Sequence, residues 1–89
     1  MRTTQVRIVN RLGLHARAAA KLVSLASTFE SEISLEKDSK HVNAKSIMGV
    51  MMLAAGQGST LTLEIDGPDE EEAERQLLDL INGYFGEGE

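Results

Sequence analysis

The amino-acid sequence predicts an α+β fold, an open-faced β-sandwich in which three helices cover one face of a four-stranded antiparallel sheet. Segments typical of strands alternate polar and apolar residues, which gives each strand one face for solvent and favours an antiparallel sheet. Helical segments lie between and after them, in the order β-α-β-β-α-β-α. The chain has 89 residues, 42% of them hydrophobic, which suits one core. We therefore expect residues 1–89 to form a single domain.

The first strand and the first helix follow from two different periodicities. Residues 4–9 alternate, with Val6 and Ile8 on one face, and this pattern predicts a strand. After a loop, residues 16–28 are rich in alanine, leucine and lysine, and apolar side chains recur at spacings of three and four. That recurrence predicts a helix whose buried face carries Ala19, Leu22, Val23, Ala26 and Phe29.

A hairpin is predicted next. Residues 32–37 alternate strictly, with Ile33 and Leu35 on the inner face. Asp38-Ser39 suits a tight turn, after which residues 40–43 would return as a short strand.

The second helix is expected to begin after Ser46, because serine is favoured at the N-cap. It would cover residues 47–55 and stop at Gly56. Residues 60–66 form the clearest strand pattern in the chain, with one face made of Leu61, Leu63 and Ile65.

We expect the last helix to begin at Gly67-Pro68, because proline suits the first helical position. The acids of residues 69–72 suit the positive end of the helix dipole. The buried stripe of this helix would consist of Ala73, Leu77, Ile81 and Tyr84. The ending, residues 86–89, is expected to fray.

Composition and charge argue against several classes of function. The net charge is -5 and aromatic residues make up 3% of the chain, whereas nucleic acids select basic surfaces and aromatic stacking platforms. The cysteine count is 0 and the histidine count is 2, so we expect no disulfide and no metal site. The chain shows no signal peptide and no apolar run long enough to span a bilayer. We therefore expect a cytoplasmic protein that binds no nucleic acid and does not insert into membranes.

His15 and Arg17 are the first candidates for chemistry. His15 lies at the expected N-cap of the first helix, and Arg17 lies in its first turn. A helix N-terminus binds anions, a neutral imidazole can act as a covalent nucleophile, and a guanidinium binds phosphate oxygens. The spacing therefore suits a phosphoryl group carried on the His15 ring. A surface histidine beside a solvated arginine explains the same spacing, and on spacing alone it is the commoner arrangement.

Two separated motifs resemble those of one protein family. Residues 13–17 read Gly-Leu-His-Ala-Arg, and residues 45–51 read Lys-Ser-Ile-Met-Gly-Val-Met. Both resemble the histidine phosphocarrier proteins (HPr) of the bacterial phosphotransferase system, and the resemblance covers nearly the whole chain. Residues 10–13 and 83–85 resemble more closely NPr, the nitrogen-branch paralogue.

The resemblance implies a mechanism. His15 would accept a phosphoryl group on Nδ1 from phosphorylated Enzyme I, which phosphoenolpyruvate charges, and would pass it to a histidine of an EIIA-type domain. Arg17 would steady the phosphate. The protein would be a monomeric carrier without a cofactor, not an enzyme, and would serve sugar transport or nitrogen-branch regulation. Ala18 departs from the family pattern, which usually has proline there, and this puts the rigidity of the loop-to-helix junction in question.

Ser46 has two interpretations. As an N-cap it would stabilise the second helix by about 1 kcal/mol. The resemblance of residues 45–51 to HPr forms that HPr kinase/phosphorylase modifies implies a regulatory phosphorylation site. A binding module regulated through Ser46 is therefore the alternative to the phosphocarrier function. An interaction domain with an unrelated partner, in which His15 has no role, is a third hypothesis.

The second helix carries more apolar side chains than so short an element can bury. An exposed remainder would form an adaptable contact surface. The resemblance implies that Enzyme I and EIIA dock on this remainder and on the first helix, through Ile47, Met48 and Met51 and through Ala16, Ala20 and Lys21. His41 has no acidic partner that the sequence reveals, and we expect no catalytic role for it.

Overall fold

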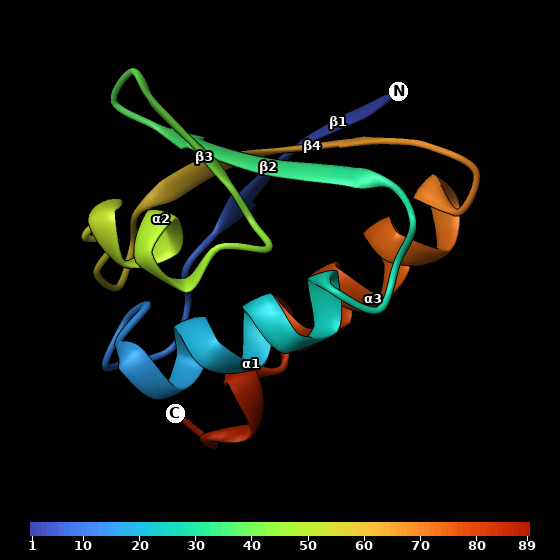
Figure 1. Cartoon of the computed structure of the whole chain (residues 1–89). Coiled ribbons are helices and arrows are strands. Elements are labelled where there is room, and N and C mark those ends of the chain that lie inside the picture. Colours follow the sequence, from blue (N-terminus) through green and yellow to red (C-terminus); the bar gives the residue numbers. More distant parts are fainter.

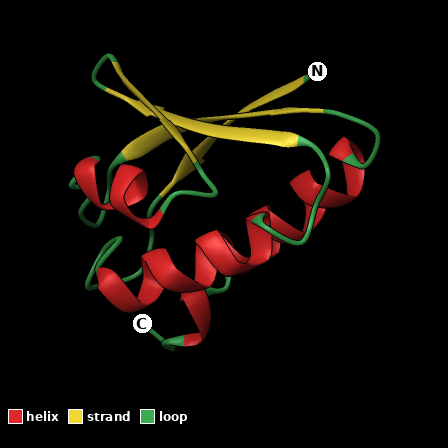
Figure 2. Cartoon of the chain, in the orientation of Figure 1, coloured by secondary structure: helices red, strands yellow, loops and turns green.

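The computed structural model describes residues 1–89 and confirms the predicted class. Four strands form one antiparallel sheet in the order β1-β4-β2-β3. The elements along the chain are β1 (Arg2–Arg7), α1 (Ala16–Ala26), β2 (Glu32–Lys37), β3 (Lys40–Asn43), α2 (Ile47–Met52), β4 (Thr60–Asp66), α3 (Glu70–Asn82) and the 3-10 helix η1 (Tyr84–Gly86). All three α-helices lie on one face of the sheet and leave the other face bare (Figure 1; Figure 2).

The core lies between the sheet and the helices, and it is formed by the inward-facing side chains of the strands and the apolar faces of the helices. Leu61, Leu63 and Ile65 of β4 point inward and are buried, while the residues between them are at least partly exposed. The helices supply small and large side chains opposite them, among which Ala19, Leu22, Ala73, Leu77 and Ile81 are buried. Full burial of one such leucine or isoleucine stabilises the fold by about 1.5–3 kcal/mol. No helix is both long and apolar enough to cross a membrane.

The ends of several elements differ from the predicted ones. β1 begins at Arg2 rather than at residue 4, because its backbone pairs with β4 from that point and the Arg2 side chain reaches Glu74 of α3, with Nε 2.9 Å from Oε1. α1 ends at Ala26, two residues early. α2 ends at Met52 instead of residue 55, because Ala54 turns the chain away with a φ of 50°.

The start of α3 also differs, because a long-range contact sets it. The helix begins at Glu70, and Gly67-Pro68 belongs to the turn before it. The Asp69 carboxylate accepts hydrogen bonds from the backbone N–H groups of Glu30, at 2.9 Å, and Ser31, at 3.0 Å, and from the Ser31 hydroxyl. Asp69 thus ties the loop before β2 to the start of α3.

The C-terminal segment corrects one prediction. Tyr84 was expected in the buried stripe of α3 but is 40% exposed, and Phe85 is fully buried in its place. Both residues have left-handed backbones, with φ of 61° and 53°, so the chain leaves the helical path and a different side chain faces the core. After α3 the chain returns across α1, where the Lys21 ammonium donates a 2.6 Å hydrogen bond to the Phe85 carbonyl oxygen, and the fraying of residues 86–89 stays a prediction.

We expect the Asp69→Ala variant to be less stable than the wild type above the ordinary aspartate pKa of about 3.8. Hydrogen bonds from the Ser31 hydroxyl and from the backbone N–H groups of Glu30 and Ser31 lower the pKa of Asp69. A lowered folded-state pKa gives stability that is fully present above the unfolded-state pKa and is lost as the pH falls through the folded-state value. The measurement is urea unfolding from pH 7 to pH 3.

Asp79→Ala is the matched control, because Asp79 makes only a surface ion pair with Arg75. The difference in the free energy of unfolding between wild type and Asp69→Ala should shrink below pH 3.8, and an undiminished difference would contradict the role of Asp69. So would an Asp79→Ala variant that loses as much stability as Asp69→Ala.

Candidate functional site

His15 is the N-cap of α1, as predicted, and its ring is turned back over the first helical turn. Its backbone is extended, with φ of -72° and ψ of 177°, and Nδ1 accepts a hydrogen bond of 3.3 Å from the Arg17 N–H. The His15 carbonyl oxygen accepts the first intrahelical bond, from Ala19 at 2.8 Å. Because first-turn N–H groups lack intrahelical partners, Nδ1 faces a place suited to an anion.

The loop before His15 is held by backbone contacts that only glycine permits. Gly13 has a φ of +70°, and a Cβ atom there would lie 2.8 Å from the Ala55 carbonyl oxygen. That oxygen accepts a 2.8 Å hydrogen bond from the Leu14 N–H. The buried Asn10 side chain donates a 2.7 Å bond to the Gly13 carbonyl oxygen. These contacts fix the chain on both sides of Gly13 and so place His15.

Ala18, where the family usually has proline, fits this junction. It is fully buried at the third position of α1. Its N–H lies in the first turn, where no intrahelical carbonyl is within reach. Alanine is also the strongest helix former, so α1 forms here without the proline.

Glu87, which the sequence analysis missed, occupies the other side of the imidazole. One carboxylate oxygen is hydrogen-bonded to His15 Nε2, and the other accepts a 3.0 Å bond from Asn10 Nδ2. The hydrogen bonds from Asn10 and then from His15 lower the pKa of Glu87. No motif marks this residue, and the acid-glycine alternation of the tail gave only the expectation of fraying.

Arg17 and Lys21 line the same shallow cavity as His15. The cavity has a volume of about 390 Å³ and is lined by Leu12, His15, Arg17, Lys21, Gly86, Glu87 and Glu89. Arg17 is exposed, and its guanidinium takes part in no ion pair. The structure therefore brings His15 and Arg17, predicted for chemistry, to one cavity with the predicted docking residue Lys21, and adds the carboxylates of Glu87 and Glu89 to it.

Ser46 caps α2, as the N-cap interpretation predicts, and its Oγ accepts a 3.2 Å bond from the Gly49 N–H. The predicted docking residues on this helix are exposed, with Met48 reaching 72%, and Met52 extends the apolar surface beyond the predicted set. We call Ile47, Met48, Met51 and Met52 the apolar patch. Ala16, Ala20 and Lys21 are exposed on α1, which packs beside α2 (Figure 1).

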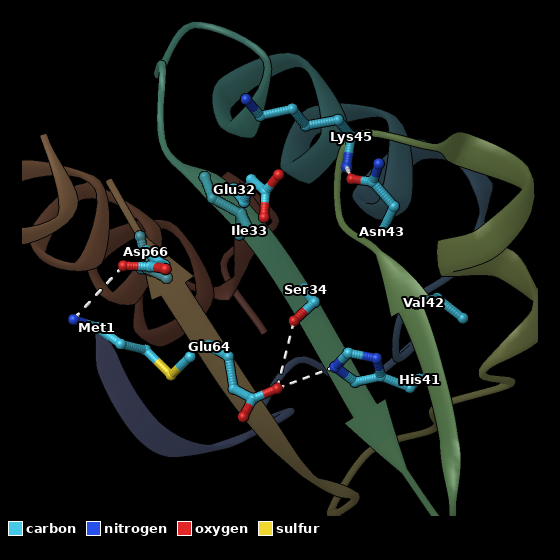
Figure 3. A pocket seen from close by; sticks show the side chains of 11 residues that line it. Met1, Glu32, Ile33, Ser34, His41, Val42, Asn43, Lys45, Glu64 and Asp66 are labelled. Atoms are coloured by element: carbon cyan, nitrogen blue, oxygen red, sulfur yellow. Dashed lines mark hydrogen bonds and ion pairs between the residues drawn. The ribbon is translucent and has the colours of Figure 1, made fainter. Parts of the chain in front are cut away.

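A larger cavity lies elsewhere, on the bare face of the sheet. It has a volume of about 590 Å³ and contains the second histidine. Figure 3 shows that both His41 and Ser34 contact the Glu64 carboxylate, whose Oε1 lies 2.9 Å from His41 Nε2 and 3.4 Å from the Ser34 hydroxyl. No group of three histidine, cysteine, aspartate or glutamate side chains is placed to hold a metal ion.

Fold and site together define a small α+β domain that presents one histidine nitrogen to a helix N-terminus. The family model described as "PTS HPr component phosphorylation site" matches residues 2–83. The chain belongs to the HPr family, the phosphocarrier proteins of the bacterial phosphotransferase system.

Individual relatives agree in sequence and in structure. The phosphocarrier protein HPr of Cupriavidus necator is 63% identical over 82 residues, which cover 92% of each chain. A crystal structure of HPr from Thermoanaerobacter tengcongensis superposes with a TM-score of 0.94 at 53% identity and covers 98% of each chain. A second structure from that organism, described as an HPr dimer, has a TM-score of 0.79 at 53% identity and covers 98% of this chain and 100% of its own. The monomeric state of the present chain therefore stays a prediction.

We expect Gly13→Ala to destabilise the fold by about 1–3 kcal/mol, the usual cost of a strained left-handed backbone, with the close contact to Ala55 adding to it. Gly56→Ala is the matched control, because a Cβ atom at Gly56 would meet nothing within 4 Å. Thermal unfolding followed by circular dichroism gives the comparison. Equal melting temperatures for the two variants would contradict the role assigned to Gly13.

Proposed function

We propose that this protein carries a phosphoryl group on His15 Nδ1, taken from phosphorylated Enzyme I and passed to a histidine of an EIIA-type domain. The observation that carries the proposal is the placement of Nδ1 against the first-turn N–H of α1, with Nε2 already engaged by Glu87. The protein is modified and restored in each cycle, so it acts as a carrier and not as a turnover enzyme.

The chemistry needs positioning and charge neutralisation more than acid–base catalysis. In the forward step a bond forms between Nδ1 and phosphorus while the bond between phosphorus and the donor nitrogen breaks. The N-terminus of α1 stabilises a nearby anion by about 0.3–2 kcal/mol, and the free guanidinium of Arg17 adds a bidentate phosphate ligand. Stabilisation of this moderate size lets the phosphoryl group move on to the next partner.

The apolar patch and the exposed face of α1 form the proposed docking surface. Both border the His15 end of the molecule, and the patch gathers four of the seven large apolar side chains that the chain exposes. Methionine side chains adapt to different partners. Enzyme I and EIIA would therefore meet the monomer through Ile47, Met48 and Met51 together with Ala16, Ala20 and Lys21.

We expect the wild type to gain one acid-labile phosphoryl group when it is incubated with phosphoenolpyruvate, Mg²⁺ and the Enzyme I of its own source. His15→Ala should gain none, because it lacks the nucleophile. Intact-mass spectrometry before and after acid treatment measures both. His41→Ala is the matched control and should react like the wild type, since His41 lies on the bare sheet face. A folded wild type that gains no phosphoryl group would refute the proposal.

A second candidate function is regulation through Ser46, favoured by its partly exposed position beside the apolar patch. A phosphate there would add about two negative charges to the proposed docking surface. We expect Ser46→Asp to slow phosphoryl transfer from Enzyme I on the order of tenfold, within the range of electrostatic effects on association.

Transfer kinetics by quenched-flow mass spectrometry measure this rate. Ser46→Ala tests loss of the cap alone, and Thr3→Asp adds the same charge at an exposed site on β1. A Ser46→Asp rate equal to that of the wild type would count against regulation at this site.

A further inference from the structure

The chain is anchored both before and after Glu87, and this holds the Glu87 side chain against the His15 ring. Two residues before Glu87, Phe85 is fully buried, and its carbonyl oxygen accepts a hydrogen bond from the Lys21 ammonium. Downstream, the Arg11 N–H donates a 2.9 Å bond to the Glu89 carbonyl oxygen. Gly86 and Gly88 have φ of 78° and 83°, which lets the chain turn tightly around Glu87. The carboxylate therefore reaches His15 from an anchored turn.

The two contacts of the His15 ring require the same protonation state. A neutral imidazole has one N–H and one lone pair. The Glu87 carboxylate accepts a hydrogen bond only from an N–H, which assigns the proton to Nε2. The Arg17 N–H donates to Nδ1 and so requires the lone pair there. Tail and helix thus select one tautomer from opposite sides of the ring.

We propose that Glu87 is a positioning residue that masks His15 Nε2 and thereby directs phosphorylation to Nδ1. The inference deepens the proposed function and rests on it for the identity of the biological donor. With Nε2 committed to the carboxylate, Nδ1 is the only ring nitrogen with a lone pair to attack phosphorus.

Glu87 also faces the charge that the reaction creates. When Nδ1 bonds to phosphorus, the proton stays on Nε2 and the ring becomes a cation. The electron pair of the broken phosphorus–nitrogen bond stays with the donor nitrogen. A carboxylate on the far nitrogen stabilises such a ring, as the aspartate of a catalytic triad stabilises its imidazolium. The second carboxylate oxygen stays on Asn10, so no rearrangement is needed.

The test uses the full chain and phosphoramidate, a small donor that needs no Enzyme I. Nδ1 or Nε2 attacks its phosphorus, and ammonia leaves. Phosphorus–nitrogen couplings in protein labelled with ¹⁵N at histidine identify which nitrogen carries the group. The wild type should form the Nδ1 adduct alone. Glu87→Ala should form the Nε2 adduct as well and should react at Nδ1 about tenfold more slowly, which corresponds to about 1.4 kcal/mol.

Glu87→Gln separates the two effects, because its amide oxygen still accepts from Nε2–H but carries no charge. It should restore attack at Nδ1 alone while remaining slower than the wild type. Glu71→Ala is the matched control, since it removes an exposed acid on α3, away from the ring. Ring ¹⁵N shifts of unmodified His15 should show a smaller Nε2–H fraction in Glu87→Ala only.

An Nε2 adduct in the wild type would overturn the proposal. So would Glu87→Ala protein that reacts at Nδ1 alone with the wild-type rate and tautomer, or a control that changes as much as Glu87→Ala. Because phosphoramidate bypasses Enzyme I, these results stand even if the Enzyme I experiment fails, and the two proposals can fail separately.

Discussion

The close approach of Gly13 to the backbone of Ala55 and Gly56 is the contact on which the geometry around His15 depends. It joins the loop before α1 to the connection between α2 and β4. A side chain at residue 13 would push these segments apart, and the Leu14 hydrogen bond to Ala55 would lengthen with them. The N-cap of α1 would then move, and Nδ1 would lose its position over the first turn. Packing between two short segments therefore sets the chemistry of the ring.

The strands could be predicted because each keeps one bare face, which leaves the period-two pattern of β2 and β4 intact. The start of α3 and the end of α2 could not be predicted in the same way. Asp69 shapes the start of α3 through bonds to Glu30 and Ser31, which are distant along the chain. The end of α2 depends on a left-handed alanine, Ala54, a conformation that no local pattern announces. Local sequence propensity therefore does not predict these two helix boundaries, because contacts and backbone conformations that it does not reveal set them.

The residues of the candidate site also divide into those that the local sequence reveals and one that it does not. His15, Arg17 and Ser46 lie in motifs and at helix starts, so their residue types and spacing were visible in the sequence. Glu87 was not, because its place depends on Phe85 entering the core in the position expected for Tyr84. That exchange follows from two consecutive left-handed residues after α3. A helical periodicity extended through residue 84 gives the wrong buried side chain and hides the return of the tail.

The distribution of apolar surface constrains how a carrier of this shape can work. The bare face of the sheet exposes serine, threonine and charged side chains, whereas the apolar patch lies at the end where the His15 ring meets α1. In the proposed function, a donor and an acceptor that both reach Nδ1 would cover the same patch and could not bind together. Transfer then requires that the first partner leave while the phosphoryl group remains. In the proposed function the helix N-terminus and Arg17 would hold the group during that interval, and Glu87 would support the cationic ring from the side that neither partner needs to reach.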